Sequence, residues 1–359
     1  MSPFLGRVLP PLRAALILVL VLTPALLLQG CGGWQSILEP QSPGARQIES
    51  LWWFAFGSTT LLATLVILGL LHALRRAGRA AEPREGGETA RREERFILLA
   101  GAAFPTLFLI GFLAVSVRTG TAVSQPPEEP ALTIEVVGHM FWWEVRYPEQ
   151  EITTANEIRI PAGRPVRVEV TSADVIHSFW VPQLSPGKID MIPGRTNVTW
   201  MQADEPGLYR GQCTEFCGVQ HALMSLLVVA LTEEEFATWA ARRSSNGTAP
   251  ETARDVTTRP LADDPVALEG LNVFVREGCG ACHAIEGMSR PRAAGSPGPD
   301  LTDLAQRRTL GALTVVNDRE HLTAWIRDPH QFKPGVRMPS HRMDNRELHA
   351  LVTYLETLR

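Results

Sequence analysis

The stretch GQCTEFCGVQHALM brings Cys213, Cys217, His221 and Met224 within twelve positions of one another. Thiolate and thioether sulfur favour copper over harder cations, whereas imidazole suits copper and zinc alike. A one-copper site of the blue type uses a single cysteine, so the second thiolate here exceeds that requirement. Two sulfurs could instead bridge a pair of copper ions, with one imidazole and one weak ligand left for each.

A copper pair of this kind needs a second histidine from elsewhere in the chain. The segment SADVIHSFWVP offers His177, which precedes Cys213 by 36 residues. Two other interpretations stay open. A disulfide between Cys213 and Cys217 is allowed in an oxidising compartment, and a Cys₂His₂ zinc site is chemically allowed. Both leave Met224 without a role, so the residue types favour copper.

A second cluster, EGCGACHAIEG, contains Cys279, Cys282 and His283 in the C-x-x-C-H pattern of haem attachment. Two thiols one turn apart can add to the two vinyl groups of a haem, and the adjacent imidazole can reach the iron. Met338 in KPGVRMPSHRM is the candidate for the opposite axial ligand, and methionine there raises the haem potential. A second imidazole is the alternative, and the candidates for it are His321, His330, His341 and His349.

The copper residues lie in a segment with the pattern of short strands. Residues 131–231 contain several β-prone runs separated by proline and glycine, and RPVRVEVTS alternates apolar with polar residues as a half-buried strand does. This pattern predicts a sandwich or barrel. TEEEFATWAARR follows with capping-box spacing and predicts a helix. Residues 244–262 are rich in Ser, Thr, Pro and Gly and predict a linker, and Asp264 is the predicted N-cap of the next helix.

The N-terminal part of the chain carries three apolar runs. The first follows Arg7 and Arg13 and ends in LLQGC, which resembles a bacterial lipobox, so residues 1–30 are the expected signal peptide and Cys31 the lipid-modified residue. An uncut third membrane helix is the alternative. Residues 52–74 and 96–117 are each long enough to cross a bilayer.

The segment between the two predicted spans contains seven arginines and is expected on the cytoplasmic side. Both metal domains would then face the periplasm of a bacterial inner membrane. Each of the five cysteines already has a role as a lipid, copper or haem attachment point. None remains for a structural disulfide. The net charge of −4 over 359 residues gives no indication of nucleic-acid binding.

At the level of motifs, ADVIHSFWVP, KIDMIPGR and GQCTEFCGVQHALM closely resemble the binuclear copper domain of cytochrome c oxidase subunit II, over about residues 50–242. The resemblance implies a cupredoxin-like β-sandwich and no open coordination position, so the site would be an electron relay. In that family the copper pair is bound by the equivalents of His177, Cys213, Cys217, His221 and Met224, together with the backbone carbonyl of Glu215. The family also uses the Glu215 carboxylate for a magnesium ion shared with subunit I.

The segment GHMFWWEVRY resembles the aromatic segment of the same family, with one substitution. Phe141 stands where the family usually has its first tryptophan, a residue that helps electrons pass from a docked soluble cytochrome c. Trp142 and Trp143 are the remaining candidates for that role. Simple core packing is an equally good explanation for one of the two rings.

The region around Met338 resembles class I cytochromes c, and the whole chain resembles subunit II of a caa3-type cytochrome c oxidase. We therefore expect a multidomain membrane protein with a two-helix transmembrane hairpin, a cupredoxin-like β-sandwich and a small all-α class I cytochrome c domain. The expected boundaries are 1–30 for the signal, 31–122 for the hairpin, 123–243 for the copper domain, 244–262 for the linker and 263–359 for the haem domain.

The resemblance implies a function in respiration. Electrons would pass from the covalent haem c through the copper pair to haem a in subunit I, where O₂ is reduced to water and protons are pumped. The partners would be subunit I, other oxidase subunits, the bilayer, and a donor that is cytochrome c or a respiratory complex. Three alternatives stay open: the electron-accepting subunit of a membrane nitric-oxide reductase, a scaffold subunit as in quinol oxidases, and a stand-alone lipoprotein electron shuttle.

Overall fold

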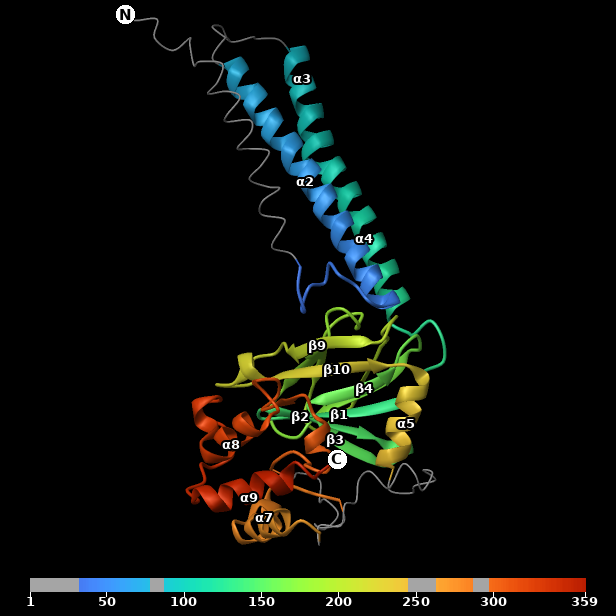
Figure 1. The fold of residues 1–359 in the computed structure, drawn as a ribbon. Helices are drawn as coiled ribbons and strands as arrows, with labels where there is room; N and C mark the ends of the chain where they lie inside the picture. Colours follow the sequence, from blue (N-terminus) through green and yellow to red (C-terminus); the bar gives the residue numbers. More distant parts are fainter. Residues whose placement is uncertain (1–31, 78–86, 245–262, 287–296) are drawn as a thin grey trace, which may run out of the picture.

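The computed structural model describes residues 32–77, 87–244, 263–286 and 297–359. The predicted signal peptide and Cys31 lie outside the described residues, as does the linker from residue 245 onward. Along the rest of the chain, Figure 1 shows three parts in sequence order: a helical hairpin, a β-sandwich, and a helical domain packed on the side of the sandwich that faces away from the hairpin.

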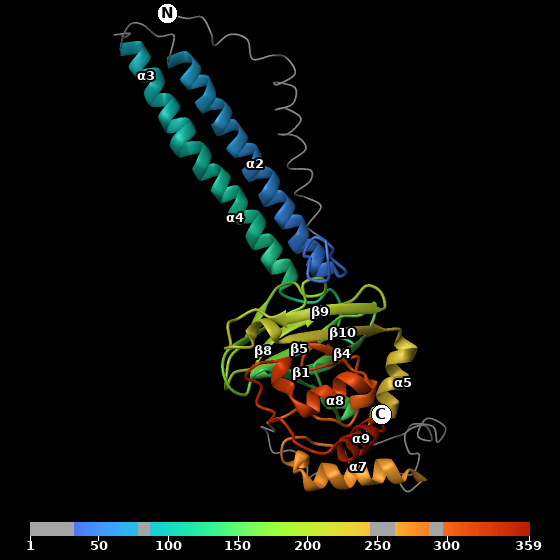
Figure 2. The same cartoon turned by 60° about the vertical axis from the view of Figure 1, so that its left-hand side comes forward.

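The hairpin consists of two long antiparallel helical arms, which Figure 2 shows side by side. The first is α2 (Pro43–Ala77), and the second runs through α3 (Gly87–Phe96), the π-helix Ile97–Ala103 and α4 (Phe104–Val123). Both arms exceed the predicted spans because the helices continue beyond the purely apolar residues. Each is long and apolar enough to cross a membrane, and none of its most apolar window is buried. Buried core helices would not leave this surface uncovered.

The middle of the chain is a cupredoxin-like sandwich of two five-stranded sheets. One sheet has the order β3-β2-β1-β5-β8 and the other β4-β10-β9-β6-β7. The strands are β1 (Thr133–His139), β2 (Trp142–Tyr147), β3 (Ile152–Ala155), β4 (Glu157–Pro161), β5 (Val166–Ser172), β6 (His177–Trp180), β7 (Ile189–Met191), β8 (Asn197–Met201), β9 (Gly207–Cys213) and β10 (Ser225–Leu231).

The strand patterns explain most of the sandwich. In β5 the three valines at 166, 168 and 170 are fully buried between the sheets, as the alternation predicted. The run 132–147 forms two strands, β1 and β2, which turn at Met140 and Phe141 and pair antiparallel. Helix α5 (Glu233–Arg243) begins with the predicted capping box between Thr232 and Glu235.

The C-terminal domain is built around three helices, α7 (Pro265–Arg276), α8 (Arg319–Arg327) and α9 (Asn345–Leu355), and a two-residue ribbon, β11 (Thr309–Leu310) with β12 (Val315–Val316). Asp264 caps α7 as predicted, and Pro265 occupies the first turn. Helices α7 and α9 cross closely at Gly270, where a Cβ atom would lie 2.0 Å from the carbonyl oxygen of Ala350. Only glycine permits this close crossing, and α7 leads directly into the C-x-x-C-H motif.

Candidate copper and haem sites

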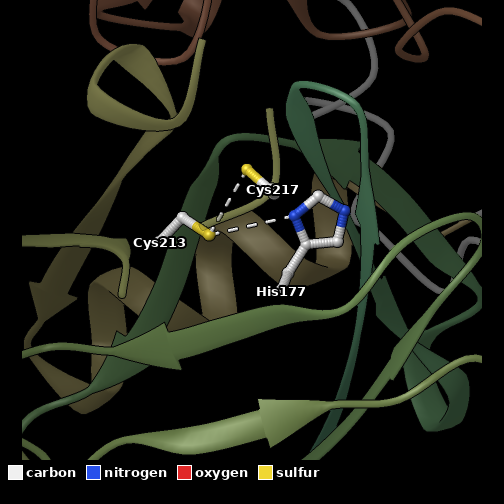
Figure 3. Close-up of side chains that lie close together, drawn as sticks. All are labelled: His177, Cys213 and Cys217. Atoms are coloured by element: carbon white, nitrogen blue, oxygen red, sulfur yellow. Dashed lines mark hydrogen bonds between the residues drawn. The ribbon is translucent and has the colours of Figure 1, made fainter. Parts of the chain in front are cut away.

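The copper candidates converge at one end of the sandwich, where β6 begins, β9 ends and β10 begins. His177 is the first residue of β6 and Cys213 the last of β9, and the loop from 214 to 224 returns the chain to β10. Figure 3 shows the imidazole of His177 pointing toward the two sulfur atoms of Cys213 and Cys217. All three residues are buried, and their ligand atoms lie within 4.8 Å of one another.

The distances between the candidate ligand atoms are compatible with metal binding by both sulfurs. The Sγ atoms of Cys213 and Cys217 are 3.8 Å apart, so both could bind one metal ion at the usual ~2.3 Å. They are too far apart for a disulfide, whose S–S distance is about 2.05 Å. The other candidate atoms lie close by: His177 Nδ1 is 3.8 Å from Cys213 Sγ, His221 Nδ1 3.8 Å and Met224 Sδ 3.9 Å from Cys217 Sγ, and the Glu215 carbonyl oxygen 3.2 Å from Cys213 Sγ.

Neighbouring residues fix the orientation of the His177 ring. Its Nε2 lies 2.9 Å from Oδ1 of Asp174, which leaves Nδ1 facing the sulfurs. The ring also packs on Gly138 of β1, where a Cβ atom would come within 2.8 Å of it. Burial raises the pKa of Asp174, but hydrogen bonds from His177 and from the backbone of Met140 and Val175 outweigh it and lower that pKa to about 2. The imidazole is therefore held by a carboxylate.

The two thiols influence each other strongly. The hydrogen bond between their sulfur atoms lowers the pKa of Cys213 and raises the pKa of Cys217. One thiolate thus forms easily, and the second needs a further positive charge nearby. A metal ion supplies such a charge, because coordination deprotonates a thiol outright.

The side chain of Glu215 is directed away from the sulfurs. Its carboxylate lies 3.4 Å from Nζ of Lys188, and both side chains are about half exposed. Lys188 also contacts Asp190 at 3.0 Å. The Glu215 carbonyl and carboxylate therefore face different surroundings, and no other acidic group joins Glu215 in a cation-binding cluster among the described residues.

The haem candidates line a largely apolar cavity of the C-terminal domain. Cys279, Cys282, His283 and Met338 all border this cavity. His283 Nδ1 lies 2.8 Å from the carbonyl oxygen of Pro299, so Nδ1 donates and Nε2 is left for a metal. Gly298 packs against the same ring, where a Cβ atom would lie 2.7 Å from Cε1. The imidazole is thus fixed in the tautomer that an axial ligand needs, and the donor set fits a covalent haem.

The four alternative histidines fall in different places. His330 and His349 are exposed, and His321 is hydrogen-bonded to Asp318 at the start of α8. His341 borders the haem cavity and lies 4.0 Å from Glu277. Met338 and His341 therefore both reach the cavity wall, so geometry alone leaves Met338 and His341 as the two axial candidates.

The cavity wall is completed by the sandwich domain. The cavity is bordered, together with the haem candidates, by residues of the β1–β2 turn, the start of β2 and the β3–β4 connection: Met140, Phe141, Trp142 and Asn156. The Trp142 ring stacks on His139 with centroids 4.2 Å apart. A haem in this cavity would be covered in part by the copper domain. The sequence patterns gave no indication of this shared wall.

The two tryptophans of β2 point to opposite faces of the sheet, as neighbouring residues in a strand do. Trp142 borders the haem cavity, whereas Trp143 is fully buried in the sandwich core, with its ring centroid 6.3 Å from that of His177. Phe141 also lies between the sites. Its ring would contact a Cβ atom at Gly218, next to Cys217, at 3.1 Å. The segment 141–143 therefore spans from the haem cavity to the copper cluster.

A buried polar seam joins the two domains; we define it by Asp303 and Arg307 of the haem domain and Thr154, Glu157 and Arg159 of β3 and β4. Asp303 is fully buried and lies 2.6 Å from Arg307 and 3.7 Å from Arg159, and it accepts a hydrogen bond from Thr154. The Glu157 carboxylate accepts from the backbone N–H of Arg308 at 2.6 Å. These contacts fix the haem domain on the edge of the sandwich.

A second contact links the haem domain directly to the copper loop. Gln220 lies in the copper loop, and its side chain is buried. Its amide nitrogen donates to the carbonyl oxygens of Lys333 and Pro334 at 3.2 and 2.8 Å. Gln220 precedes the candidate ligand His221, and Pro334 lies four residues before Met338. Asp174, Gln220 and Asp303 were not identified from the sequence. The acidic residue three positions before His177 was the only local signal for any of them.

Comparison with known proteins gives two matching family models. The model described as cytochrome c oxidase subunit II, periplasmic domain, matches residues 149–231, and the cytochrome c model matches residues 267–359.

Full-length relatives match as well. The chain is 34% identical to "Cytochrome c oxidase subunit 2" of Alkalihalophilus pseudofirmus, over 93% of this chain and 94% of that protein. It is 28% identical to the protein of the same name from Bacillus subtilis, over 96% and 97%. Among solved structures, the periplasmic domain of cytochrome oxidase subunit II from Bradyrhizobium japonicum is similar at 34% identity and a TM-score of 0.32, covering 33% of this chain and 97% of that one.

Proposed function

Because the chain belongs to the cytochrome c oxidase subunit II family and carries a cytochrome c domain, we propose that it is the electron-transfer subunit of a proton-pumping respiratory oxidase. It would pass electrons from covalent haem c through a binuclear copper centre to haem a in subunit I, where O₂ is reduced to water. The single observation that carries this proposal is that residues 141–143 lie between the two candidate ligand sets: this segment borders the haem cavity on one side and contacts the copper loop at Gly218 on the other.

The copper pair would be held by His177, Cys213, Cys217, His221 and Met224 and by the backbone carbonyl of Glu215. A bound copper pair would supply one-electron chemistry at these residues. Supporting this assignment, the candidate side chains lie close together at one end of the sandwich, where Asp174 and Gly138 fix the ring of His177.

Haem c would be held by thioether bonds to Cys279 and Cys282, with His283 and Met338 as axial ligands. The hydrogen bond from His283 Nδ1 to Pro299 supports His283, because it leaves Nε2 for the iron. Of the two candidates opposite, we favour Met338. A methionine ligand gives the higher potential that a donor to an oxidase requires. Bound haem supplies a reversible one-electron store beside the segment 141–143.

Within that segment, Trp142 and Trp143 remain the proposed residues through which electrons pass, with Phe141 as a third contact. Trp142 borders the haem cavity and Trp143 packs near His177, which supports a route along β2. The same geometry suggests that an external donor delivers electrons to the haem domain, because that domain covers the 140–142 turn. The donor would be a cytochrome c or a respiratory complex.

The protein would span the bacterial inner membrane twice, with both metal domains in the periplasm and subunit I and further oxidase subunits as partners. Two uncovered apolar helical arms and a periplasmic-domain match support an extracytoplasmic, membrane-anchored domain. A magnesium ion shared with subunit I at the Glu215 carboxylate remains a prediction; among the described residues, this carboxylate pairs with Lys188.

The decisive experiment is a metal and haem count of the purified complex, combined with electron paramagnetic resonance and rapid single-turnover kinetics. We expect two coppers and one covalent haem c per chain, a mixed-valence copper signal, and reduction of subunit I haem only after the copper pair. One zinc ion in place of the copper pair, or purification as an isolated monomer, would contradict the proposal. Rapid turnover with nitric oxide but not with O₂ would point to a nitric-oxide reductase.

A further inference from the structure

Lys333 is a buried cation that neither proposed metal site uses. It is one of only two lysines in the chain, and only 2% of its surface is exposed. Its Nζ donates hydrogen bonds to two backbone carbonyls, Phe141 at 2.8 Å in the copper domain and Gly311 at 3.1 Å in the haem domain. The side chain therefore lies at the junction of the two domains.

Lys333 has no acidic partner among the described residues. Its ammonium carries three hydrogens, and the two carbonyls accept two of them. Fully buried lysines are almost always paired, because an unpaired buried charge costs several kcal/mol. Burial lowers the pKa of Lys333 to about 7, although the charge of the Cys217 thiolate acts to raise it. No carboxylate among the described residues pairs with this ammonium, so the site can accept a carboxylate from outside the chain.

The haem cavity is where such an anion could come from, because Lys333 borders it. Two other cations border the same cavity. Arg307 is already neutralised by Asp303 at 2.6 Å, and Arg337 is exposed to solvent. Lys333 is thus the buried cavity-lining cation that lacks a carboxylate within the described residues. A haem carries two carboxylate groups in addition to the vinyl groups that react with cysteine.

We propose that Lys333 is the counter-ion of a haem carboxylate at the junction of the two domains and that, through the Phe141 carbonyl, it positions the β1–β2 turn against the haem. This inference rests on the proposed function only in requiring haem c in the cavity. Lys333 is a positioning residue, because it holds the backbone of Phe141. The ring of Phe141 in turn lies beside Gly218 of the copper loop.

The charge of Lys333 would also affect the haem potential. A buried positive charge close to the iron disfavours the oxidised form, which carries one more positive charge than the reduced form. In a low-dielectric interior this effect is much larger than at the surface. Loss of the charge should therefore lower the potential of haem c while leaving the thioether bonds intact.

The test uses the full-length chain in its membrane complex, with Lys333→Met and Lys333→Gln. Both substitutions remove the charge, and glutamine keeps a hydrogen-bond donor. We expect the equilibrium constant for haem c reduction to fall about tenfold or more in both variants, which is about 59 mV for one electron. Arg342→Gln is the matched control: it removes an exposed cation from the same domain, and its effect is screened by solvent.

A second measurement addresses the carboxylate directly. With ¹³C at the haem carboxyl carbons, the redox-difference infrared spectrum should show a carboxylate band that moves in both Lys333 variants and stays fixed in Arg342→Gln. An unchanged haem potential with an unchanged band, in variants that still stain for covalent haem, would overturn the proposal alone. Absence of covalent haem from the wild-type chain would overturn the proposed function as well.

Discussion

At the candidate copper site, four of the five side chains are buried in the core of a sandwich, and the fifth, His221, is half-buried on the loop between β9 and β10. His177 and Met224 are fully buried, and Cys213 and Cys217 are nearly so. The haem ligands instead border a cavity of a small domain, and one wall of that cavity belongs to the neighbouring sandwich. The candidate copper residues all come from one domain, whereas the cavity beside the haem candidates is enclosed by residues of two domains. The haem cavity therefore depends on the docking of the two domains for one of its walls, whereas the described hydrogen bonds between the copper loop and the haem domain all come from Gln220.

This difference predicts independent loss of the two centres. Cys217→Ser should abolish the mixed-valence copper signal, because a hydroxyl does not replace a bridging thiolate for copper. Covalent haem should remain at the wild-type level, as measured by haem staining after denaturation. Thr214→Ser in the same loop is the control and should keep both centres. A copper signal of wild-type intensity in Cys217→Ser would refute the two-thiolate assignment.

The reciprocal variant is Cys279→Ser. It removes one of the two thioether bonds, so the amount of covalent haem should fall well below the wild-type level. The copper signal should persist, since the sandwich core does not involve Cys279. Haem staining and electron paramagnetic resonance of the same membranes measure the two outcomes together. Loss of both signals would show that the copper site also depends on the seam, which would remove the contrast between the two regions.

The seam itself is tested by Asp303→Asn. This change leaves the buried Arg307 and Arg159 without their common carboxylate, and removal of one partner of a buried pair costs about 3–5 kcal/mol. We expect a lower melting temperature of the haem domain and slower haem-to-copper transfer with the copper signal unchanged. Glu286→Gln is the matched control, because Glu286 is half exposed where it meets Arg243 and such pairs contribute about 0–1 kcal/mol. Equal effects of the two substitutions would argue against a tightly docked domain.

A smaller change within the copper site is Met224→Leu. The thioether is the weak ligand of the set, so the copper pair should remain bound while its potential shifts. We expect a shift equivalent to less than about tenfold in the equilibrium constant, or 59 mV, as measured by an optical redox titration. The haem potential should not move. Complete loss of copper would mean that Met224 is a principal ligand and not a weak one.

The smallest expected effect is that of Glu157→Gln. Burial raises the pKa of Glu157 in the folded protein above 4.5, despite the backbone hydrogen bond from Arg308. The folded state then binds more protons than the unfolded state above pH 4.5, so Glu157 makes the protein lose stability as the pH rises through that window. Glutamine keeps an acceptor for the backbone N–H of Arg308 and removes the pH dependence of stability that Glu157 causes.

The melting temperature of the wild type should therefore fall relative to Glu157→Gln as the pH increases from about 4.5 toward neutrality. Asp303 behaves in the opposite way. Its pKa is lowered despite burial, because Arg307, Arg243 and Arg159 stabilise the carboxylate. The stability that Asp303 contributes is therefore fully present above the ordinary aspartate pKa of 3.8 and is lost only as the pH falls below that value. A variant ranking with Glu157→Gln less stable than Asp303→Asn at pH 7 would reverse our interpretation of the seam.

Local patterns determined much of the molecule. Alternating valines predicted β5, capping residues predicted the starts of α5 and α7, and the C-x-x-C-H spacing located the haem motif. These signals work because strand period, helix capping and short motif spacing are set by residues only a few positions apart. The motifs also predicted which residues would meet at the copper site, including His177, and the structure brings them together.

Only the tertiary structure decided how the two metal domains face each other. The contacts that matter there, Lys333 with Phe141, Gln220 with Pro334 and Asp303 with Arg159, join residues more than a hundred positions apart and leave no periodic or local signal. The buried charges of the seam and of Lys333 also depend on this packing, because the cost of removing a charge from water depends on its three-dimensional surroundings. The sequence by itself specified the residues of the two candidate sites, and the packing of one domain on the other decided how those two groups of residues lie relative to each other.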